Sequence, residues 1–327
     1  MKVLLIGATG LLGRNVLDAL LAAGYSVRIL ARHPEKIQNV GQLCEIIEGQ
    51  LLDETVMEQA MQGCDAIVNC AGCTDMSALK MDDMMPINSH LCSLIVQTML
   101  KTGVKILVHT STVDTIGYGS SEAPANEESV MRPPFSQSIY ALSKKKGEDE
   151  VLKAAEKIHD GHIVVVNPGF LVGAYDNRPS SGALLDAAYK RPFMVATAGG
   201  KCFVHVADAA QAIVNALTMG KNGQRYILTN RAAEMSLKDF YSLQANVMGY
   251  HQLCVVLPRW LTMCVGSIGN LLRSMGIKTQ LSLNNIRQLS VYGHYDNTKA
   301  RVDLKLKETP IDQAISDYFK YKHTLIK

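Results

Sequence analysis

Tyr140 and Lys144 stand one helical turn apart in the segment SIYALSKKKGEDE, residues 138–150. Steps of helical spacing from Tyr140 trace a stripe that becomes apolar after two turns and should face the interior: Lys144, Gly147, Val151, Ala154, Ala155 and Ile158. A nearby ammonium lowers the pKa of a tyrosine from its usual ~10, so this pair fits acid/base chemistry on a carbonyl or carbinol oxygen. The alternative is a core tyrosine beside a lysine that extends to solvent.

The other charges of this segment belong on the opposite side of the helix. Lys145 and Lys146 each precede an acidic residue by four positions, Asp149 and Glu150. Pairs at this spacing are typical of a solvated helix face. Lys144 is therefore the lysine of this run that needs another explanation.

Three hydroxyl side chains follow the apolar run KILVH: Thr110, Ser111 and Thr112. A run of this kind indicates a buried parallel strand, and parallel sheets bind ligands where their strands end. A hydroxyl at that edge can donate to the oxygen on which Tyr140 would act. We therefore expect this strand end and the Tyr140 helix to meet at one site.

Gly7, Gly10 and Gly13 lie in GATGLLG, directly after the first apolar run and at the start of a predicted helix, residues 11–23. Glycines here allow a tight turn, close approach of the backbone to a pyrophosphate, and close packing of helix on strand. The amino end of the helix attracts the anion. The pattern predicts a dinucleotide site, and the alternative is a purely structural turn.

The second strand, SVRIL, is followed by Ala31, Arg32 and His33, where a free ribose 2′-hydroxyl usually meets Asp or Glu. A guanidinium suits a 2′-phosphate instead. We therefore expect Arg32, with Arg28 and Arg14 nearby, to favour NADP(H), with NAD(H) as the other cofactor considered. The alternative is that Arg32 is a solvated loop residue.

Apolar runs alternate with helical patterns through the first half of the chain: KVLLIG, SVRIL, CEIIEG, DAIVNCA, KILVHTS and HIVVVNP. Such runs, joined by helices, predict an α/β protein with a doubly wound parallel sheet of the Rossmann type. After Pro168 the pattern becomes rich in loops and helices, which predicts a smaller, mostly helical substrate lobe. We assign residues 1–168 and about 201–230 to the NADP-binding domain, and about 169–200 and 231–327 to the lobe.

The composition is globular, with 47% of the 327 residues hydrophobic and 19% charged. No long basic block is present, which argues against nucleic-acid binding. We expect a cytoplasmic protein with reduced cysteines and no metal, since Cys70 and Cys73 form a CxxC without a second pair. The uncharged stretch 260–272 is shorter than the ~20 residues of a spanning helix; we expect it to line a substrate pocket, with peripheral membrane contact as the alternative.

Together these segments resemble the extended short-chain dehydrogenases/reductases of the NAD-dependent epimerase/dehydratase family. The resemblance covers nearly the whole chain and rests on GATGLLG, HTST before VDTIGYG, YALSK, NPGFLVGAYD, FVHVADAA and YDNTKA. It is closest to the branch of dihydroflavonol 4-reductase-like, 3β-hydroxysteroid dehydrogenase-like and sugar epimerase-like proteins. The motifs are specific for the superfamily rather than for one substrate.

The resemblance implies roles for individual residues. Tyr140 would be the general acid/base, and Lys144 would bind the nicotinamide ribose and lower the tyrosine pKa. Thr112 aligns with the usual catalytic serine, Ser111 is a further candidate, and Asn88 would support the site. The implied cofactor-binding positions are Gly7, Thr9, Gly10, Leu11, Leu12, Gly13, Arg32, Gln50, Leu51, Ala71, Gly72, Tyr140, Lys144, Asn167, Pro168 and Gly169.

Several positions depart from the family pattern or match it without a catalytic role. Gln50 stands where an aspartate often contacts adenine, and Thr112 adds a methyl group to the usual serine. The segment after Asn88 reads Ser-His-Leu-Cys where Gly and Thr are commoner. His205 and Asp208 match a strand–helix junction and are expected to be structural.

Three functions remain open. The first is an NADP(H)-dependent interconversion of carbonyl and alcohol on a moderately apolar small molecule, since the lobe supplies Leu, Met, Val and Trp260. The second is a nucleotide-sugar epimerase or dehydratase with a recycling cofactor. The third is a non-catalytic NADP-binding sensor, against which the Tyr140–Lys144 pair argues. The family commonly forms homodimers through helices beside the sheet, including the one that carries Tyr140.

The second function needs cations that hold a diphosphate. The lobe offers Arg178, Arg191, Lys201, Arg259 and Arg287, but the sequence does not place two of them together. A dehydratase often adds an acid beside the catalytic hydroxyl. Asp114 follows Thr112 by two positions, but we expect its side chain to face away.

Overall fold

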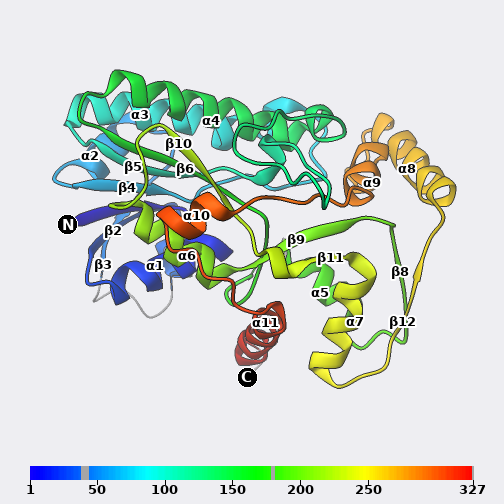
Figure 1. The fold of residues 1–327 in the computed structure, drawn as a ribbon. Coiled ribbons are helices and arrows are strands. Elements are labelled where there is room, and N and C mark those ends of the chain that lie inside the picture. The colour runs from blue at the N-terminus through cyan, green and yellow to red at the C-terminus, as the bar shows by residue number, and fades with distance from the viewer. Residues whose placement is uncertain (38–43, 178–180, 326–327) are drawn as a thin grey trace.

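The computed structural model describes residues 1–37, 44–177 and 181–325 (Figure 1). Its strands are β1 (Lys2–Ile6), β2 (Ser26–Ala31), β3 (Cys44–Glu48), β4 (Ala66–Asn69), β5 (Ile106–Thr110), β6 (His162–Pro168), β7 (Phe170–Val172), β8 (Phe193–Ala196), β9 (Gly200–His205), β10 (Gln224–Leu228), β11 (Glu234–Ser236) and β12 (Leu253–Val256). Its α-helices are α1 (Leu11–Ala22), α2 (Glu54–Met61), α3 (Leu91–Thr102), α4 (Ile139–Lys157), α5 (Gly182–Ala188), α6 (Val206–Ala216), α7 (Leu237–Met248), α8 (Arg259–Ser274), α9 (Leu283–Leu289), α10 (Thr298–Asp303) and α11 (Ile311–Leu325). Two short turns also carry site residues, the π-helical η3 (Pro86–His90) and the 3-10 turn η4 (Val113–Thr115).

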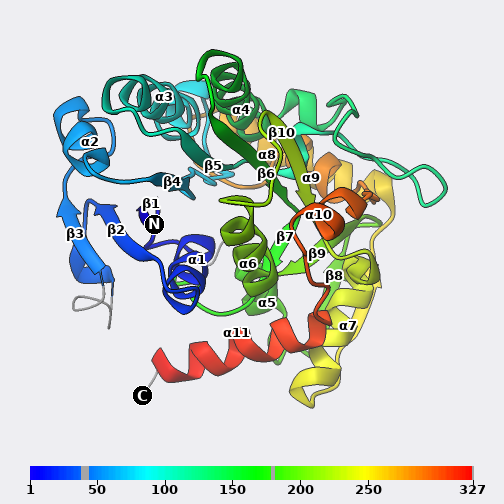
Figure 2. The same ribbon diagram turned by 60° about the vertical axis from the view of Figure 1, so that its left-hand side comes forward.

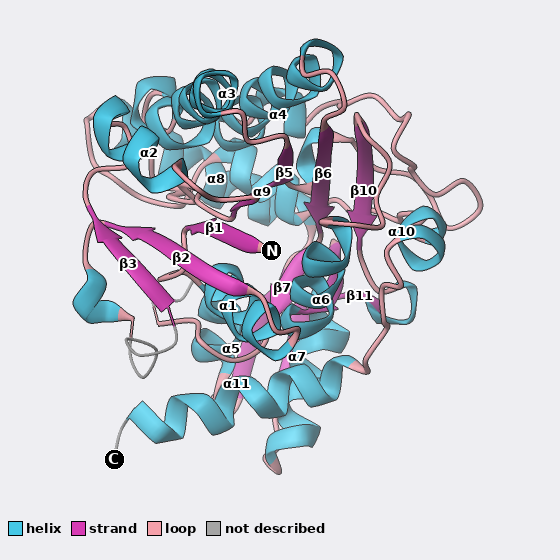
Figure 3. Ribbon diagram, turned by 90° about the vertical axis from the view of Figure 1, so that its left-hand side faces the viewer, coloured by secondary structure: helices cyan, strands magenta, loops and turns pink. Residues whose placement is uncertain are grey.

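Seven strands form one parallel sheet in the order β10-β6-β5-β4-β1-β2-β3. Helices α1 and α6 cover one face, and α2, α3 and α4 cover the other (Figures 2 and 3). Because both faces are buried, the strands are nearly continuous apolar runs. The predicted fold class, a doubly wound sheet of the Rossmann type with a smaller lobe, is confirmed.

The order of the sheet reverses between β1 and β4. The chain builds β1, β2 and β3 in one direction, then continues outward on the other side with β4, β5, β6 and β10. A crevice therefore opens at the carboxyl ends of the strands, where ligands bind in such sheets. The motifs singled out in the sequence follow β1, β2, β4, β5 and β6 at this edge.

The lobe lies beyond the carboxyl edge of the sheet and contains two small sheets as well as helices (Figure 1). One sheet has the order β11-β9-β7, and the other pairs β8 with β12. A separate apolar core, which includes Phe203, Phe240 and Phe319, joins these strands to α5, α7 and α11. Helix α10 returns to the large sheet, where Tyr226 of β10 donates a hydrogen bond to Asp303 at 3.0 Å.

His205 and Asp208, at the junction of β9 and α6, hold the last part of the chain. The imidazole of His205 lies 3.2 Å from Asp317 of α11. The carboxylate of Asp208 accepts hydrogen bonds from the backbone and hydroxyl of Thr309. Both residues are structural here, as the sequence predicts.

Within the described ranges, no helix is long and apolar enough to cross a membrane.

Candidate active site

Helix α4 carries Tyr140 and Lys144 on the face that packs toward the sheet. The Lys144 side chain is only 3% exposed, and its ammonium donates to the Thr110 carbonyl oxygen at 2.6 Å. The following positions of the predicted inner stripe are buried as well: Gly147, Val151 and Ala154. The helical spacing therefore identified the inner face of α4 correctly.

On the outer side of α4, one of the two predicted ion pairs forms and the other does not. Lys145 pairs with Asp149 as predicted. The predicted pairing of Lys146 with Glu150 is wrong, because Glu150 binds Lys153 instead, at 3.2 Å. On a helix, a glutamate that precedes its lysine is better placed than one that follows it.

Tyr140 and Thr112 meet where α4 begins and β5 ends. Burial raises the pKa of the Tyr140 phenol, the negative charge of Asp114 raises it further, and a hydrogen bond from Thr112 lowers it. The net effect is a raised pKa. The Lys144 ammonium donates to the Thr110 carbonyl in this structure, and its effect on the pKa of Tyr140 stays a prediction. Burial also lowers the pKa of Lys144 itself.

Asp114 faces the site, contrary to the sequence-based expectation. Burial raises the pKa of Asp114, and the Lys201 ammonium lowers it. The expectation assumed that side chains continue to alternate after β5. Asp114 lies in η4, however, where each residue turns the chain by ~120°. Since Lys201 belongs to β9, the charge that acts on Asp114 comes from the side of the lobe.

Ser111 is not brought to the phenol in the same way. Its backbone N–H donates to the Val166 carbonyl at 2.7 Å. Its buried hydroxyl has no hydrogen-bond partner among the residues that the structure describes. Of the two adjacent candidates, Thr112 is therefore the one that contacts Tyr140.

Asn88, on η3, is fully buried and clamps the loop that follows β4. Its side-chain amide donates to the Cys73 carbonyl at 2.9 Å, and its oxygen accepts from the Cys73 N–H at 2.8 Å. The same amide donates to Ser143 of α4 at 2.9 Å. A Cβ atom on Gly72 would lie 3.7 Å from the Asn88 oxygen and 3.9 Å from the Lys144 ammonium. Asn88 thus positions the loop beside Lys144, as the resemblance implies.

A buried polar network behind Thr112 was missed in the sequence. The Asn167 amide donates to the Thr112 carbonyl at 3.1 Å and to Glu148 at 2.8 Å. Glu148 also accepts from Thr115 and pairs with Arg225 at 3.2 Å. Glu148 follows Lys144 by four residues, so the inner-face spacing could have identified it within the charge run. The Asn167 side chain supports Thr112 here rather than extending into the crevice.

The glycine turn fits a dinucleotide phosphate. Gly7 has φ +93°, and a Cβ atom there would come within 2.6 Å of the Ala71 N–H nitrogen. Gly10 begins α1 without a side-chain cap, and the first turn of the helix has no acidic residue. Thr9 and Gly10 are exposed, whereas Leu12 and Gly13 are buried and Leu11 is half-buried. The uncapped helix terminus is thus accessible to an anion.

The end of β2 offers Arg32 but not Arg28. Arg32 is exposed directly after the strand. Arg28 is buried and bound by Glu45 at 2.9 Å and by the Ala60 and Gln62 carbonyls, so the prediction that it lies near the ribose is wrong. Carbonyls at the end of α2 attract its charge.

The remaining predicted cofactor positions lie along the same edge. Arg14 pairs with Asp18 and lies over the Tyr175 ring, 5.0 Å from its centroid. Gln50 is exposed after β3, whereas Leu51 is part of the apolar core. The others follow β4 or end β6: Ala71, Gly72, Pro168 and Gly169.

A cavity of about 710 Å³ between the lobe and the segment before α4 has two arginines in its lining; we call it the lobe cavity. Arg259 of α8 and Arg287 of α9 both line it, along with Tyr118, Met263 and Tyr292. The expectation that the 260–272 stretch lines a pocket is correct for Thr262 and Met263. It is wrong for Trp260, which is 67% exposed on the other side of α8. Arg178 lies outside the described residues.

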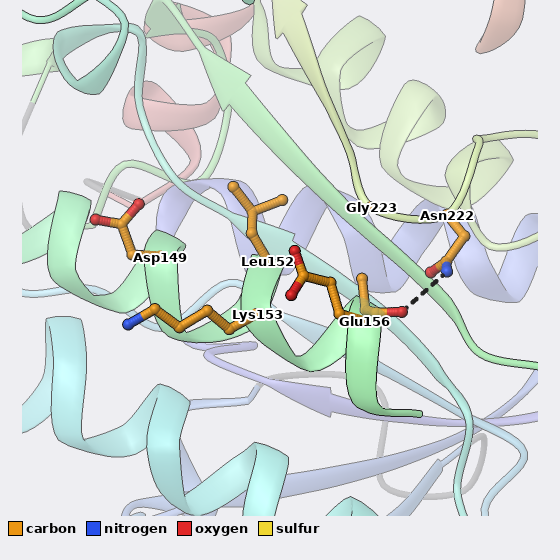
Figure 4. Close-up of a pocket in the computed structure, with 7 residues that line it drawn as sticks. Asp149, Leu152, Lys153, Glu156, Asn222 and Gly223 are labelled. Atoms are coloured by element: carbon orange, nitrogen blue, oxygen red, sulfur yellow. Dashed lines mark hydrogen bonds between the residues drawn. The ribbon is translucent and has the colours of Figure 1, made fainter. Parts of the chain in front are cut away.

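A second cleft lies away from these residues, against the outer side of α4 (Figure 4). Lys153, Glu156 and Asn222 line it, and Asn222 donates to the Ala155 carbonyl at 3.3 Å. It shares no residue with the catalytic candidates.

Cys70, the first cysteine of the CxxC, is not a reactive thiolate, because burial raises its pKa to about 12.

The sequence profile of the NAD dependent epimerase/dehydratase family matches residues 3–229. The chain belongs to this family. Members of this type are NAD(P)-dependent oxidoreductase-type enzymes with a Rossmann fold, and this chain is one of them.

Relatives named as reductases support this assignment, and a solved epimerase shares the fold. A protein of Synechocystis sp. provisionally named dihydroflavonol 4-reductase is 27% identical over 95% of this chain and 91% of its own. A 4-hydroxy-2-methyl-3-oxo-4-farnesyl-3,4-dihydroquinoline-1-oxide ketoreductase of Stigmatella aurantiaca is 29% identical over 76% of this chain and 74% of its own. A UDP-glucose 4-epimerase of Thermus thermophilus, solved in complex with NAD, matches 99% of both chains with a TM-score of 0.78 at 17% identity. At that identity the last comparison shows the fold alone.

Proposed function

We propose that this family member is an NADP(H)-dependent oxidoreductase that interconverts a carbonyl and an alcohol on a moderately apolar small molecule. The observation that carries the proposal is the meeting of the Thr112 hydroxyl, the Tyr140 phenol and the buried Lys144 beside the glycine turn. A nicotinamide dinucleotide, when bound, supplies the redox chemistry. The relatives named as reductases support this direction.

The chain's own residues would then divide the work. Tyr140 gives a proton to the substrate oxygen during reduction and takes it back during oxidation. Thr112 donates a hydrogen bond to the same oxygen, and Lys144 binds the ribose hydroxyls. Asn88 and Asn167 are positioning residues, since they hold the Cys73 loop and the Thr112 carbonyl rather than the substrate.

For the cofactor, we propose that the amino end of α1 holds the pyrophosphate and that Arg32 binds a 2′-phosphate. The uncapped helix terminus and the exposed guanidinium after β2 support this assignment. NAD(H) remains the competing cofactor, and its binding would leave Arg32 without a ligand contact.

Arg259 and Arg287 favour a second candidate, a nucleotide-sugar epimerase or dehydratase with a recycling cofactor. Both line one cavity, as the binding of a diphosphate would require. Asp114, which faces Tyr140, adds the acid that a dehydratase would use. The apolar share of the cavity lining, including Met263, Val291 and Ala198, keeps the reductase as the first candidate.

Turnover measurements separate the candidates. Net consumption of NADPH with ketones, sterols or flavanonols supports the reductase. Tyr140→Phe should lower this turnover by about 10²–10⁴-fold and leave NADPH affinity within about twofold, because the phenol acts in proton transfer. Unchanged turnover of the variant would refute the role of Tyr140.

The other outcomes identify the alternatives. Copurifying cofactor, with UDP- or GDP-sugars that raise the melting temperature, would indicate the epimerase or dehydratase. If NADPH binds but no carbonyl compound oxidises it, the protein would be the non-catalytic sensor.

We also propose a cytoplasmic homodimer that packs through the exposed sides of α3 and α4, which lie side by side on one face of the sheet (Figure 2). Sedimentation equilibrium should give twice the chain mass. Exchanging Leu100, which is exposed on α3, for Glu should then shift the equilibrium to the monomer.

A further inference from the structure

Helix α8 packs on its neighbour with its small residues and turns its large apolar residues outward. Gly266 and Gly269 are buried against α9 and the segment before it. A Cβ atom on Gly266 would come within 2.9 Å of the Leu283 Cα, and one on Gly269 would collide with the Leu281 carbonyl. The contact that holds α8 in the fold therefore uses its least apolar face.

The opposite face of α8 carries a continuous exposed stripe at helical spacing. Its members are Trp260 (67% exposed), Cys264, Ile268 (60%) and Leu271 (63%), and Met275 (68%) extends it just past the end of the helix. Nothing in the fold of the described chain requires large apolar side chains at these positions. A stripe of this kind marks a surface that another apolar phase covers.

The sheet of β8 and β12 continues the apolar character at the same end of the molecule (Figure 1). Strand β12 leads into α8 after only Leu257 and Pro258. Alternate residues of the two strands are exposed on one face of this sheet: Phe193, Val195, Leu253 and Val255. We call these four residues and the α8 stripe together the apolar tip.

The segment that carries most of the apolar tip contains basic residues and no acidic ones. Residues 240–295 contain no Asp or Glu but include Arg259, Arg273, Lys278 and Arg287. In the described structure, none of these four cations forms an ion pair with a carboxylate. Hydrogen bonds from Ser77 lower the pKa of Asp75, and backbone hydrogen bonds from Lys80 and Leu79 lower the pKa of Asp83; the nearby Lys278 ammonium lowers both further. Among the arginines, Arg273 donates to the Met76, Ala78 and Thr279 carbonyls.

We propose that the apolar tip docks on the surface of an anionic lipid bilayer. Exposed apolar side chains on one face of a helix, flanked by cations and without acids, fit the boundary of headgroups and acyl chains. Tryptophan prefers this boundary. Helix α8 has 16 residues and would lie in the plane of the surface, not across the membrane. Arg259, Thr262 and Met263 of the same helix line the lobe cavity, so α8 forms both the docking surface and a wall of that cavity.

A second copy of the chain fits this surface less well. A two-fold contact brings the same patch of both copies together, so the arginines of one would approach those of the other. The segment offers no carboxylate to pair with them. Anionic headgroups provide the missing opposite charge.

The chain carries its own reporter for this proposal, because Trp260 is its one tryptophan. The full-length protein is mixed with vesicles of phosphatidylcholine alone or with phosphatidylglycerol. Trp260 emission should shift to shorter wavelength with the anionic vesicles, and lipids brominated on the acyl chains should quench it. Added salt should weaken the association. Unchanged emission and no quenching with anionic vesicles would overturn the proposal.

Matched substitutions test the surface itself. The pair Ile268→Ser and Leu271→Ser should weaken partitioning to anionic vesicles by at least ~10-fold, since both side chains lose their transfer to the apolar phase. Val130→Ser and Val302→Ser remove exposed apolar groups elsewhere, and these variants should bind within about twofold of the wild type. Equal loss in both pairs would refute the assignment to the tip. A blue shift that rises with protein concentration in the absence of lipid would also refute it, because a second copy would then cover Trp260.

Discussion

The large sheet and the apolar tip use the same kinds of side chain in opposite ways. In the sheet, Leu4, Leu5 and Ile6 are completely buried. At the tip, Trp260 and Leu271 are more than half exposed on a helix that packs through glycine. The sheet is explained by folding and by the cofactor. The tip is explained by neither, and this difference is what indicates an external partner.

Truncation of one leucine in each region tests this difference in burial. Leu5→Ala should lower the free energy of unfolding by about 3 kcal/mol, because a cavity remains in a close-packed core. Leu271→Ala should change it by less than about 0.5 kcal/mol, because the side chain makes few contacts in water. Urea unfolding followed by circular dichroism measures both. Similar losses would mean that the tip contributes to the fold after all.

Polar groups can be compared in the same manner. Glu148→Gln leaves Arg225 without its buried partner and should cost roughly 3 kcal/mol of stability. Glu150→Gln, on the solvated side of the same helix, should cost less than about 1 kcal/mol. Thermal unfolding of both variants at one pH is the measurement. A neutral Glu148→Gln would show that the network behind Thr112 is not needed for folding.

A substitution of Arg32 tests whether the cofactor explains the exposed cation at the carboxyl edge of the sheet. Arg32→Ala should reduce the ratio of NADPH to NADH affinity by about tenfold, the value of one charged contact with a phosphate. Lys36→Ala, in the turn that follows β2, is the control. Titration calorimetry gives both ratios, and an unchanged ratio would contradict the NADP(H) preference.

The smallest effect is expected at the junction of the two regions. The Asp114 charge raises the pKa of Tyr140, so Asp114→Asn should lower that pKa. Alcohol oxidation needs the phenolate and rises with pH, so its rising limb should move to lower pH. At a fixed pH below that limb, oxidation should become roughly two- to fivefold faster. A limb that stays in place or moves upward would show that Asp114 does not act on the phenol.

Sequence reasoning succeeded where the backbone or helical spacing restricts the residue type. Gly7 has a conformation and a neighbour that exclude a side chain, and the α4 stripe follows from 3.6 residues per turn. It failed where side-chain direction depends on tertiary contacts. Arg28 lies on a strand whose face toward α2 could not be known, and Asp114 follows a turn that ends the alternation of β5. Arg259 and Arg287 belong to different helices, and only the packing of α8 on α9 brings them to one cavity.

Asn88 joins two parts of the candidate active site through one buried side chain. Its side chain satisfies both backbone groups of Cys73, as the neighbouring residue of a β-ladder would, so it acts as a one-residue extension of the sheet beyond the end of β4. Its third hydrogen bond holds Ser143, which follows Tyr140 by one turn on α4. One side chain therefore fixes the position of the Gly72 loop relative to the helix that carries the phenol.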